Sequence, residues 1–142
     1  MTVDTLLRKK QGRIIAISQN ASATAAAKLL RAENIGAVVV KDSCSTEGDV
    51  VLGMLSERDI LAALVRYGTN AMNMSVGALM TRSIVSCRMS DQLDYVAELM
   101  HRHQIRHVAV MDREAVIGVI SIRDLLPERR GLGVGCNEAA LG

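Results

Sequence analysis

The sequence contains no phenylalanine, no tryptophan and only two tyrosines among its 142 residues, although 49% of the residues are hydrophobic. A core built from this composition must be aliphatic and rich in alanine and methionine, which is a packable combination. Proteins that bind single-stranded nucleic acids stack bases on aromatic side chains, and this chain lacks such platforms. Its 17 lysines and arginines against 15 acidic residues also give too weak a field to indicate nucleic acid as the main partner.

Cysteine is scarce, and the spacing of the cysteines favours neither disulfide bonds nor a metal site. The odd set Cys44, Cys87 and Cys136 has no CxxC spacing, which indicates reduced thiols rather than a disulfide framework or a metal cluster. The charged N-terminal segment is followed by no apolar run, which excludes a signal peptide. The longest uncharged stretch, 67–81, is too rich in Thr, Asn, Ser and Gly to span a membrane. We therefore expect a cytoplasmic protein with no membrane partner.

A tandem repeat organises the chain. The segment 53–60, Gly-Met-Leu-Ser-Glu-Arg-Asp-Ile, recurs at 118–125 as Gly-Val-Ile-Ser-Ile-Arg-Asp-Leu. In each copy an apolar run typical of a strand ends at a serine, and the serine stands where a helix should begin. Each copy therefore brings a hydroxyl, a guanidinium and a carboxylate to one strand-to-helix corner.

The two copies share the predicted order strand, helix, strand, strand, helix. Hydrophobic patterning predicts strands at 14–17, 37–40 and 50–55 in the first copy and at 84–87, 108–111 and 115–120 in the second. A helix capped near Ser22 should end at 34–36, and a helix at 57–66 should follow the first corner. A lead-in helix at 3–10 has a counterpart at 76–80, and Pro127 should cut the last helix short.

This pattern resembles the cystathionine-β-synthase (CBS) domain, specifically a free-standing CBS pair, also called a Bateman module, over about residues 1–128. The family motif of Gly, two apolar residues, Ser or Thr, two variable positions and Asp is matched twice. Val39 and Ala109 stand where the family usually has a proline in the second strand. The resemblance implies an α+β fold of two pseudo-symmetric repeats, each a small three-stranded sheet flanked by two helices.

The predicted domains follow the order of the repeats along the chain. Residues 1–70 would form the first CBS domain with the N-terminal helix, and 71–128 the second with its lead-in helix. The tail at 129–142 has no usable period, so we expect it to be disordered.

The repeated corner has chemistry suited to a nucleotide. Ser56 and Ser121 would present a hydroxyl and free backbone N–H groups to an anion, and Arg58 and Arg123 add positive charge. The carboxylates of Asp59 and Asp124 could accept both hydroxyls of a ribose. Ser-x-x-Asp is also a helix capping box, but the arginine between the two residues has no role in capping.

The resemblance extends the two ligand slots to further positions. Around the first corner, Ser56, Arg58 and Asp59, it implies Ile14, Ile15, Ile35, Gly36, Ala37 and Met54. Around the second corner, Ser121, Arg123 and Asp124, it implies Thr81, Ile84, Val85, Ile105, Arg106, His107 and Val119. Because Arg106 and His107 replace Gly36 and Ala37, the second slot should favour additional phosphate charge.

The function implied is a regulatory, ligand-sensing CBS-domain protein without catalysis of its own. It would bind an adenine nucleotide, AMP, ADP, ATP or NAD(H), in the cleft between the two repeats, and act on an unidentified regulated protein. Arg58 and Arg123 argue against S-adenosylmethionine, whose sulfonium would face them. No acid–base pair or nucleophile is suggested, and no metal is required, since His101 and His103 point to different helix faces. An interaction scaffold with empty slots and a nucleic-acid-binding module stay open as alternatives.

A homodimer is also expected, because two helices are apolar on more than one side. Residues 60–65 are consecutively apolar. The second copy has a similar surplus: Leu93, Tyr95, Val96, Ala97, Leu99 and Met100. Such surfaces favour a symmetric interface between two copies. Alternatively, the lead-in segments 3–7 and 76–80 cover them within a monomer.

Overall fold

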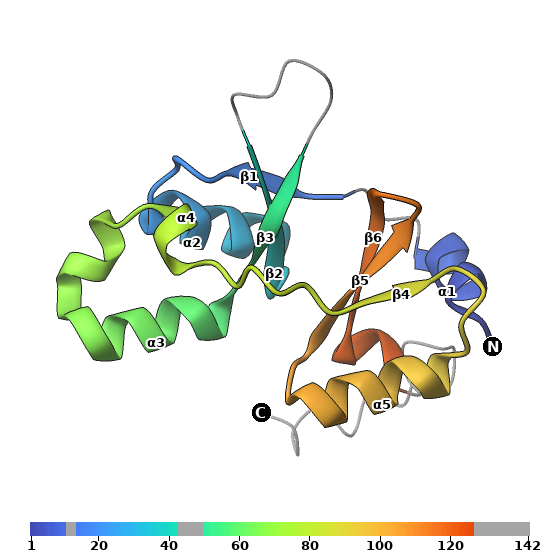
Figure 1. Cartoon of the computed structure of the whole chain (residues 1–142). Coiled ribbons are helices and arrows are strands. Elements are labelled where there is room, and N and C mark those ends of the chain that lie inside the picture. Colours follow the sequence, from blue (N-terminus) through green and yellow to red (C-terminus); the bar gives the residue numbers. More distant parts are fainter. Residues whose placement is uncertain (11–13, 43–49, 127–142) are drawn as a thin grey trace. The chain divides into compact units, whose positions relative to one another are not determined.

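The computed structural model describes residues 1–10, 14–42 and 50–126. The chain divides into two compact units, Arg13–Ile84 and a second unit made of Met1–Gly12 with Val85–Gly142. The first contains the first repeat and the second contains the second repeat (Figure 1). The expected disordered tail at 129–142 lies outside the described residues.

The unit of the first repeat is built on a three-stranded sheet of order β1-β2-β3. The short strand β1 (Ala16–Ser18) runs parallel to β2 (Ala37–Lys41), and β3 (Val51–Ser56) runs antiparallel to β2. Helix α2 (Ala23–Glu33) connects the parallel pair. Helix α3 (Glu57–Tyr67) follows β3 directly, and then come a 3₁₀ helix η1 (Gly68–Asn73) and the short helix α4 (Val76–Leu79).

The unit of the second repeat has the same sheet. Strand β4 (Ser86–Arg88) is parallel to β5 (His107–Asp112), which is antiparallel to β6 (Ala115–Ser121), and α5 (Leu93–His103) connects the parallel pair. The 3₁₀ helix η2 (Ile122–Leu125) follows β6, and α1 (Val3–Lys10) completes the unit. The predicted α+β fold of two repeats with three-stranded sheets is therefore confirmed.

Local signals in the sequence set the ends of the helices. The Ser22 hydroxyl caps α2 by accepting a hydrogen bond from the Ala25 N–H. The helix ends at Asn34, whose φ of 53° is left-handed, and Gln104 ends α5 with a φ of 54°. The two copies therefore end their first helix in the same way, although neither uses glycine.

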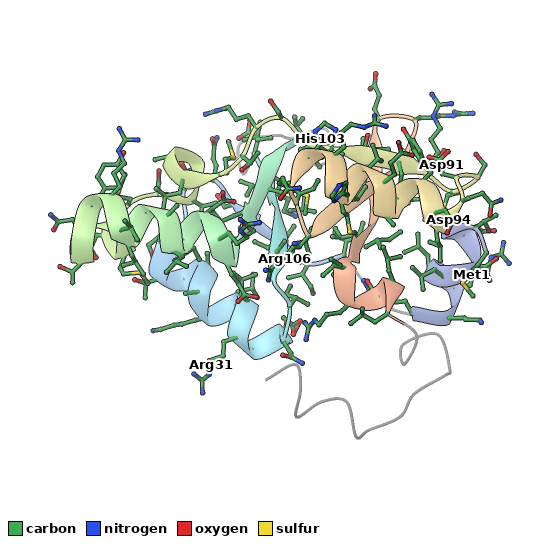
Figure 2. All side chains as sticks on the ribbon, turned by 90° about the horizontal axis from the view of Figure 1, so that it is seen from below. Met1, Arg31, Asp91, Asp94, His103 and Arg106 are labelled. Carbon is green, nitrogen blue, oxygen red and sulfur yellow. The ribbon has the colours of Figure 1, made fainter. Side chains whose placement is uncertain are left out.

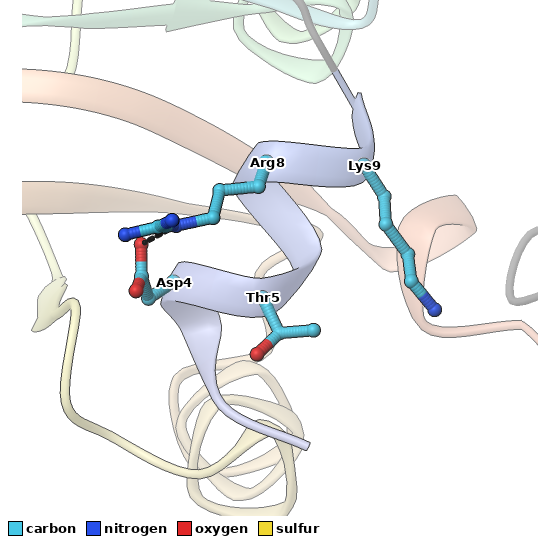
Figure 3. A pocket seen from close by; sticks show the side chains of 4 residues that line it. All are labelled: Asp4, Thr5, Arg8 and Lys9. Atoms are coloured by element: carbon cyan, nitrogen blue, oxygen red, sulfur yellow. Dashed lines mark hydrogen bonds and ion pairs between the residues drawn. The ribbon is translucent and has the colours of Figure 1, made fainter.

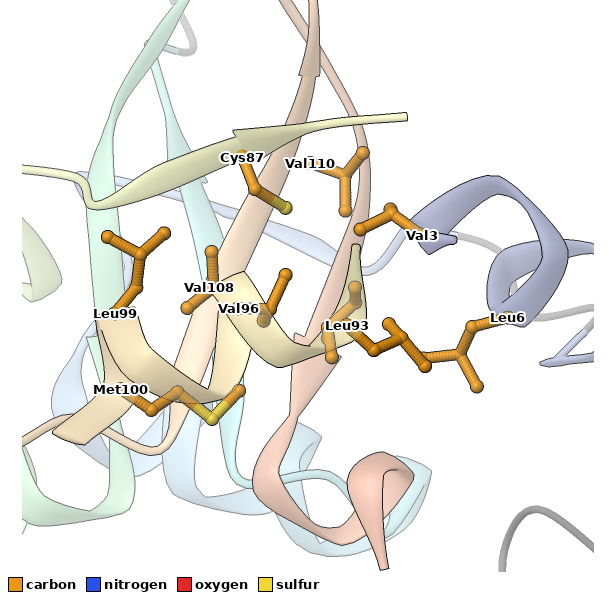
Figure 4. Packing of buried hydrophobic residues seen from close by; sticks show 10 residues of the cluster. Val3, Leu6, Cys87, Leu93, Val96, Leu99, Met100, Val108 and Val110 are labelled. Atoms are coloured by element: carbon orange, nitrogen blue, oxygen red, sulfur yellow. The ribbon is translucent and has the colours of Figure 1, made fainter. Parts of the chain in front are cut away.

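Each unit has its own aliphatic core. In the first, Leu55 is fully buried with Val38, Val40 and Leu30, and in the second Ile120 takes the place of Leu55. The second core also contains Cys87, shown with its neighbours in Figure 4. Burial raises the pKa of the Cys87 thiol to about 11, with a further contribution from the negative charge of Asp91. This thiol is protonated at neutral pH.

The lead-in helices pack on the repeats opposite to those predicted. Val3 and Leu6 of α1 belong to the core of the second repeat, and the Val3 N–H donates to the Asp91 carbonyl at 2.9 Å. Val76, which begins α4, belongs to the core of the first repeat. The boundaries 1–70 and 71–128 assign each lead-in helix to the repeat that follows it in the sequence. The structure corrects this, because each lead-in helix buries its apolar face in the core of the other repeat.

The apolar surplus expected on two helices is present on only one of them. On α3, Ile60 and Ala63 are buried, while Leu61 is 62% and Val65 83% exposed. On α5, the expected surplus is largely used within the second core, which contains Leu93, Val96, Leu99 and Met100. Among the described residues, no helix is long and apolar enough to cross a membrane.

Candidate functional site: the repeated strand-to-helix corners

The first corner forms where β3 ends at Ser56 and α3 begins. The Asp59 N–H donates to the Ser56 hydroxyl at 3.2 Å, and Asp59 Oδ2 accepts from the Ser56 N–H at 2.9 Å. The capping box considered from the sequence is therefore formed. The carboxylate does more than cap the helix, because its other oxygen, Oδ1, accepts a hydrogen bond from the Thr81 hydroxyl at 3.2 Å.

The second corner repeats this arrangement where β6 passes into η2. Asp124 Oδ2 accepts from the Ser121 N–H at 2.8 Å and from the Ser121 hydroxyl at 3.3 Å. The same oxygen also accepts a hydrogen bond from Lys10 Nζ at 2.8 Å. Lys10 Nζ donates in addition to the Val119 carbonyl at 2.6 Å. Lys10 is thus a corner residue that the sequence did not indicate.

Thr81, which the resemblance assigns to the second slot, is hydrogen-bonded at the first corner. Its N–H donates to the Met54 carbonyl at 2.8 Å, and its carbonyl accepts from the Met54 N–H at 3.0 Å. Its side chain bonds to Asp59. Ile84 also belongs to the unit of the first repeat, whereas Val85 belongs to the second unit. The prediction assigned these residues to a repeat by their order in the chain. In the structure, their positions depend on the repeat against which the lead-in segment packs.

The other first-slot residues lie around the first corner through the β2–β3 pair. Ala37 pairs with Ser56 in the strand register, and the Gly36 carbonyl accepts from the Glu57 N–H at 2.9 Å. Ile15 and Ile35 pack against the core of this unit. Ile14 precedes β1 and is 39% exposed. Arg58 is exposed on the first turn of α3.

The second-slot residues lie at equivalent positions. His107 pairs with Ser121, and the Arg106 carbonyl accepts from the Ile122 N–H at 2.8 Å. Val85 and Ile105 pack against the second core. Arg106, labelled in Figure 2, is exposed just before β5, and Arg123 is exposed on η2. Contact of any of these residues with a ligand stays a prediction.

The second corner is cationic. Burial lowers the pKa of His107 to about 4, and the positive charges of Lys10, Arg123 and Arg106 lower it further, while Asp124 opposes them. His107 is therefore a neutral imidazole at physiological pH. Among the described residues, the side chains whose charge acts on His107 are three basic ones and one carboxylate, so these surroundings favour an anion.

A separate hollow lies against α1. It is lined by Asp4, Thr5, Arg8 and Lys9, which all come from this one helix (Figure 3). Arg8 Nε donates to Asp4 Oδ1 at 3.0 Å, so the only carboxylate and one of the two cations pair with each other. Within the described residues, no group of three or more His, Cys, Asp or Glu side chains is placed to hold a metal ion.

The fold and its corners define a class of protein: a pair of tandem α+β repeats, each with a Ser-x-x-Asp corner at the start of its last helix. The sequence profile of the CBS domain matches residues 6–66 and 76–131. The chain therefore belongs to the CBS domain family, as the repeated motif predicted.

Solved structures of CBS-domain proteins are similar over nearly the whole chain. The protein ATU1752 from Agrobacterium tumefaciens has a TM-score of 0.81 at 35% identity, covering 87% of this chain and 90% of its own. PAE2072 from Pyrobaculum aerophilum, solved in complex with AMP, has a TM-score of 0.76 at 26% identity over 100% of both chains. The CBS pair of MJ0100, solved with 5'-methylthioadenosine and S-adenosyl-L-methionine, has a TM-score of 0.75 at 25% identity, covering 94% and 100%.

Proposed function

We propose that this chain is a regulatory module that binds adenosine-based ligands, AMP, ADP, ATP or NAD(H), at its repeated corners and catalyses no reaction itself. The observation that carries the proposal is how Asp59 uses its two oxygens. Oδ2 completes the capping box, and Oδ1 accepts from the hydroxyl of Thr81. Since Thr81 is exposed, a ribose hydroxyl could replace its hydroxyl without breaking the cap.

The likeness to ligand-bound CBS pairs supports the same chemistry. PAE2072 binds AMP, and MJ0100 binds S-adenosyl-L-methionine and 5'-methylthioadenosine, so the adenosine moiety is common to all three ligands. In this chain Arg58 and Arg123 favour a phosphate over a sulfonium group. Because the surrounding side chains are aliphatic, the base would be held by apolar contacts and backbone groups rather than by aromatic stacking.

Asp59→Ala is expected to lower the affinity for AMP about tenfold or more, because hydrogen bonds to a charged group contribute about 1.5–3 kcal/mol. Isothermal titration calorimetry measures this effect. The same change also removes a helix cap, so Ser22→Ala serves as the matched control. It removes the cap of α2, costs about 1 kcal/mol of stability and should leave the affinity unchanged.

Two results would contradict the proposal. The wild-type protein could show no heat of binding and no rise in melting temperature with any of the four nucleotides at millimolar concentration. That result would exclude a nucleotide sensor and would favour the interaction scaffold with empty slots. If Asp59→Ala binds AMP as the wild type does, Asp59 acts as a cap only.

We also propose that two copies associate through α3. Leu61 and Val65 are four residues apart, so they share one helix face, and both are largely exposed. An exposed apolar stripe of this kind is typical of an interface. A symmetric pair of such faces would bury both side chains of each copy.

Light scattering during gel filtration is expected to give about twice 15.3 kDa for the wild type and 15.3 kDa for Val65→Glu. The charge would be buried unpaired in the interface, at a cost of several kcal/mol. Val50→Glu, at an apolar position that is 51% exposed and directly precedes β3, should stay dimeric. A concentration-independent mass of 15.3 kDa for the wild type would rule out the dimer.

A further inference from the structure

The aspartate of the second corner has one carboxylate oxygen that no donor of the described residues reaches. Oδ2 of Asp124 accepts from the Ser121 N–H at 2.8 Å, from the Ser121 hydroxyl at 3.3 Å and from Lys10 Nζ at 2.8 Å. No donor from residues 1–10, 14–42 or 50–126 is directed at Oδ1. Within the same ranges, no buried side-chain nitrogen or oxygen lacks a hydrogen-bond partner, so Oδ1 of Asp124 is accessible to solvent.

The aspartate of the first corner differs, because a donor is directed at its Oδ1. Asp59 Oδ2 accepts from the N–H and the hydroxyl of Ser56, at 2.9 Å and 3.1 Å, as at the second corner. Asp59 Oδ1 accepts in addition from the Thr81 hydroxyl at 3.2 Å. Two backbone hydrogen bonds between Thr81 and Met54, of 2.8 Å and 3.0 Å, hold Thr81 in this position.

This difference changes how many ribose hydroxyls each aspartate can accept. A carboxylate oxygen has two lone pairs and can accept two hydrogen bonds. Oδ1 of Asp124 can therefore accept both neighbouring hydroxyls of a ribose, and Lys10 keeps its bond to Oδ2. Oδ1 of Asp59 can accept only one ribose hydroxyl as long as Thr81 donates to it.

We infer that Thr81 is a specificity-determining residue, which limits the first corner to one ribose hydroxyl where the second corner accepts two. Adenosine should therefore bind more tightly at the second corner, by about tenfold, which corresponds to one hydrogen bond to a charged group. This inference deepens the proposed function and rests on it in taking an adenosine-based ligand.

The test is calorimetric titration of the whole chain with adenosine, in an Asp124→Ala background that leaves only the first carboxylate. Adding Thr81→Val should raise the adenosine affinity about tenfold, because it frees the second lone pair of Asp59 Oδ1. Valine has nearly the shape of threonine and keeps both backbone bonds to Met54. Thr81→Ser is the matched control, since it retains the hydroxyl and should leave the affinity unchanged.

A second ligand separates this effect from a general change in the corner. An adenosine analogue that lacks both ribose hydroxyls should bind equally well with threonine and with valine at this position. A merely structural role of Thr81 would give a loss of affinity for both ligands.

Thr81→Val in the otherwise unchanged chain makes the test independent of whether Asp124→Ala folds. The wild type should show two adenosine affinities about tenfold apart, and Thr81→Val should bring them together. Unchanged or weaker adenosine binding in Thr81→Val would overturn the inference, as would a gain that persists with the analogue or appears in Thr81→Ser. Adenosine binding that is insensitive to Thr81 overturns this inference alone, whereas no adenosine binding by the wild type contradicts the proposed function as well.

Discussion

Gly53→Ala is expected to destabilise the first unit by about 3 kcal/mol, the upper part of the usual range for overpacking. The added Cβ would overlap the carbonyl oxygen of Thr81 and would lie 3.1 Å from Met80 Sδ. A carbonyl fixed by its hydrogen bond to Met54 cannot move aside as a side chain can. The strand β3 and the Thr81 segment would have to separate, and Asp59 would lose the Thr81 hydroxyl.

Gly118→Ala is the matched control, since Gly118 is the same position of the repeated motif. Its added Cβ would meet Leu7 Cδ2 at 3.0 Å and Cδ1 at 3.2 Å, the end of a flexible side chain. We expect a loss of about 1 kcal/mol there. Urea denaturation measures both free energies of unfolding, and similar losses in the two variants would show that the carbonyl at Gly53 imposes no constraint.

The stability of the wild type is expected to fall by on the order of 2–3 kcal/mol as the pH is lowered from 6.5 to 4 because of His107 alone. The folded state holds the pKa of His107 at about 4, below its ordinary value of 6.5. Below pH 6.5 the unfolded chain therefore takes up a proton that the folded chain does not, which favours unfolding. Below about pH 4 both states are protonated and the loss levels off.

The cause of this dependence is the shielded position of His107 and the three cations around it. Lys10 comes from α1 and Arg123 from η2, Arg106 precedes His107 in the chain, and Asp124 of η2 opposes them. His107→Gln should remove this part of the slope in chemical denaturation between pH 6.5 and 4. His101→Gln, at an exposed histidine of α5, should keep it. An unchanged slope in His107→Gln would contradict the expectation.

The elements of the fold were predictable because their signals are local. The Ser22 cap, the helix end near Asn34 and both Ser-x-x-Asp corners are read within a few residues, and the structure has them at those positions. Strand ends were less accurate. The first strand was predicted at 14–17 and is found at Ala16–Ser18, because only those residues pair with Val39–Lys41.

The composition of each corner was not predictable, because it depends on contacts between distant segments. Nothing near Lys10 in the sequence points to Asp124, and nothing near Thr81 points to its hydrogen bond with Asp59. Packing between distant segments also explains why α5 has less exposed apolar surface than the sequence predicted. Leu99 and Met100 were read as surplus apolar surface, but they lie in the core that Val3 and Leu6 complete.

The exchange of lead-in helices also has a consequence for the order in which the chain folds during synthesis. The unit of residues 13–84 is continuous in sequence, so it can fold as soon as it leaves the ribosome. Helix α1 emerges earlier but has to wait for β4, α5 and β6 before Val3 and Leu6 can be buried. The first helix to be made is therefore among the last to dock, and its amphipathic face stays available to chaperones throughout that interval.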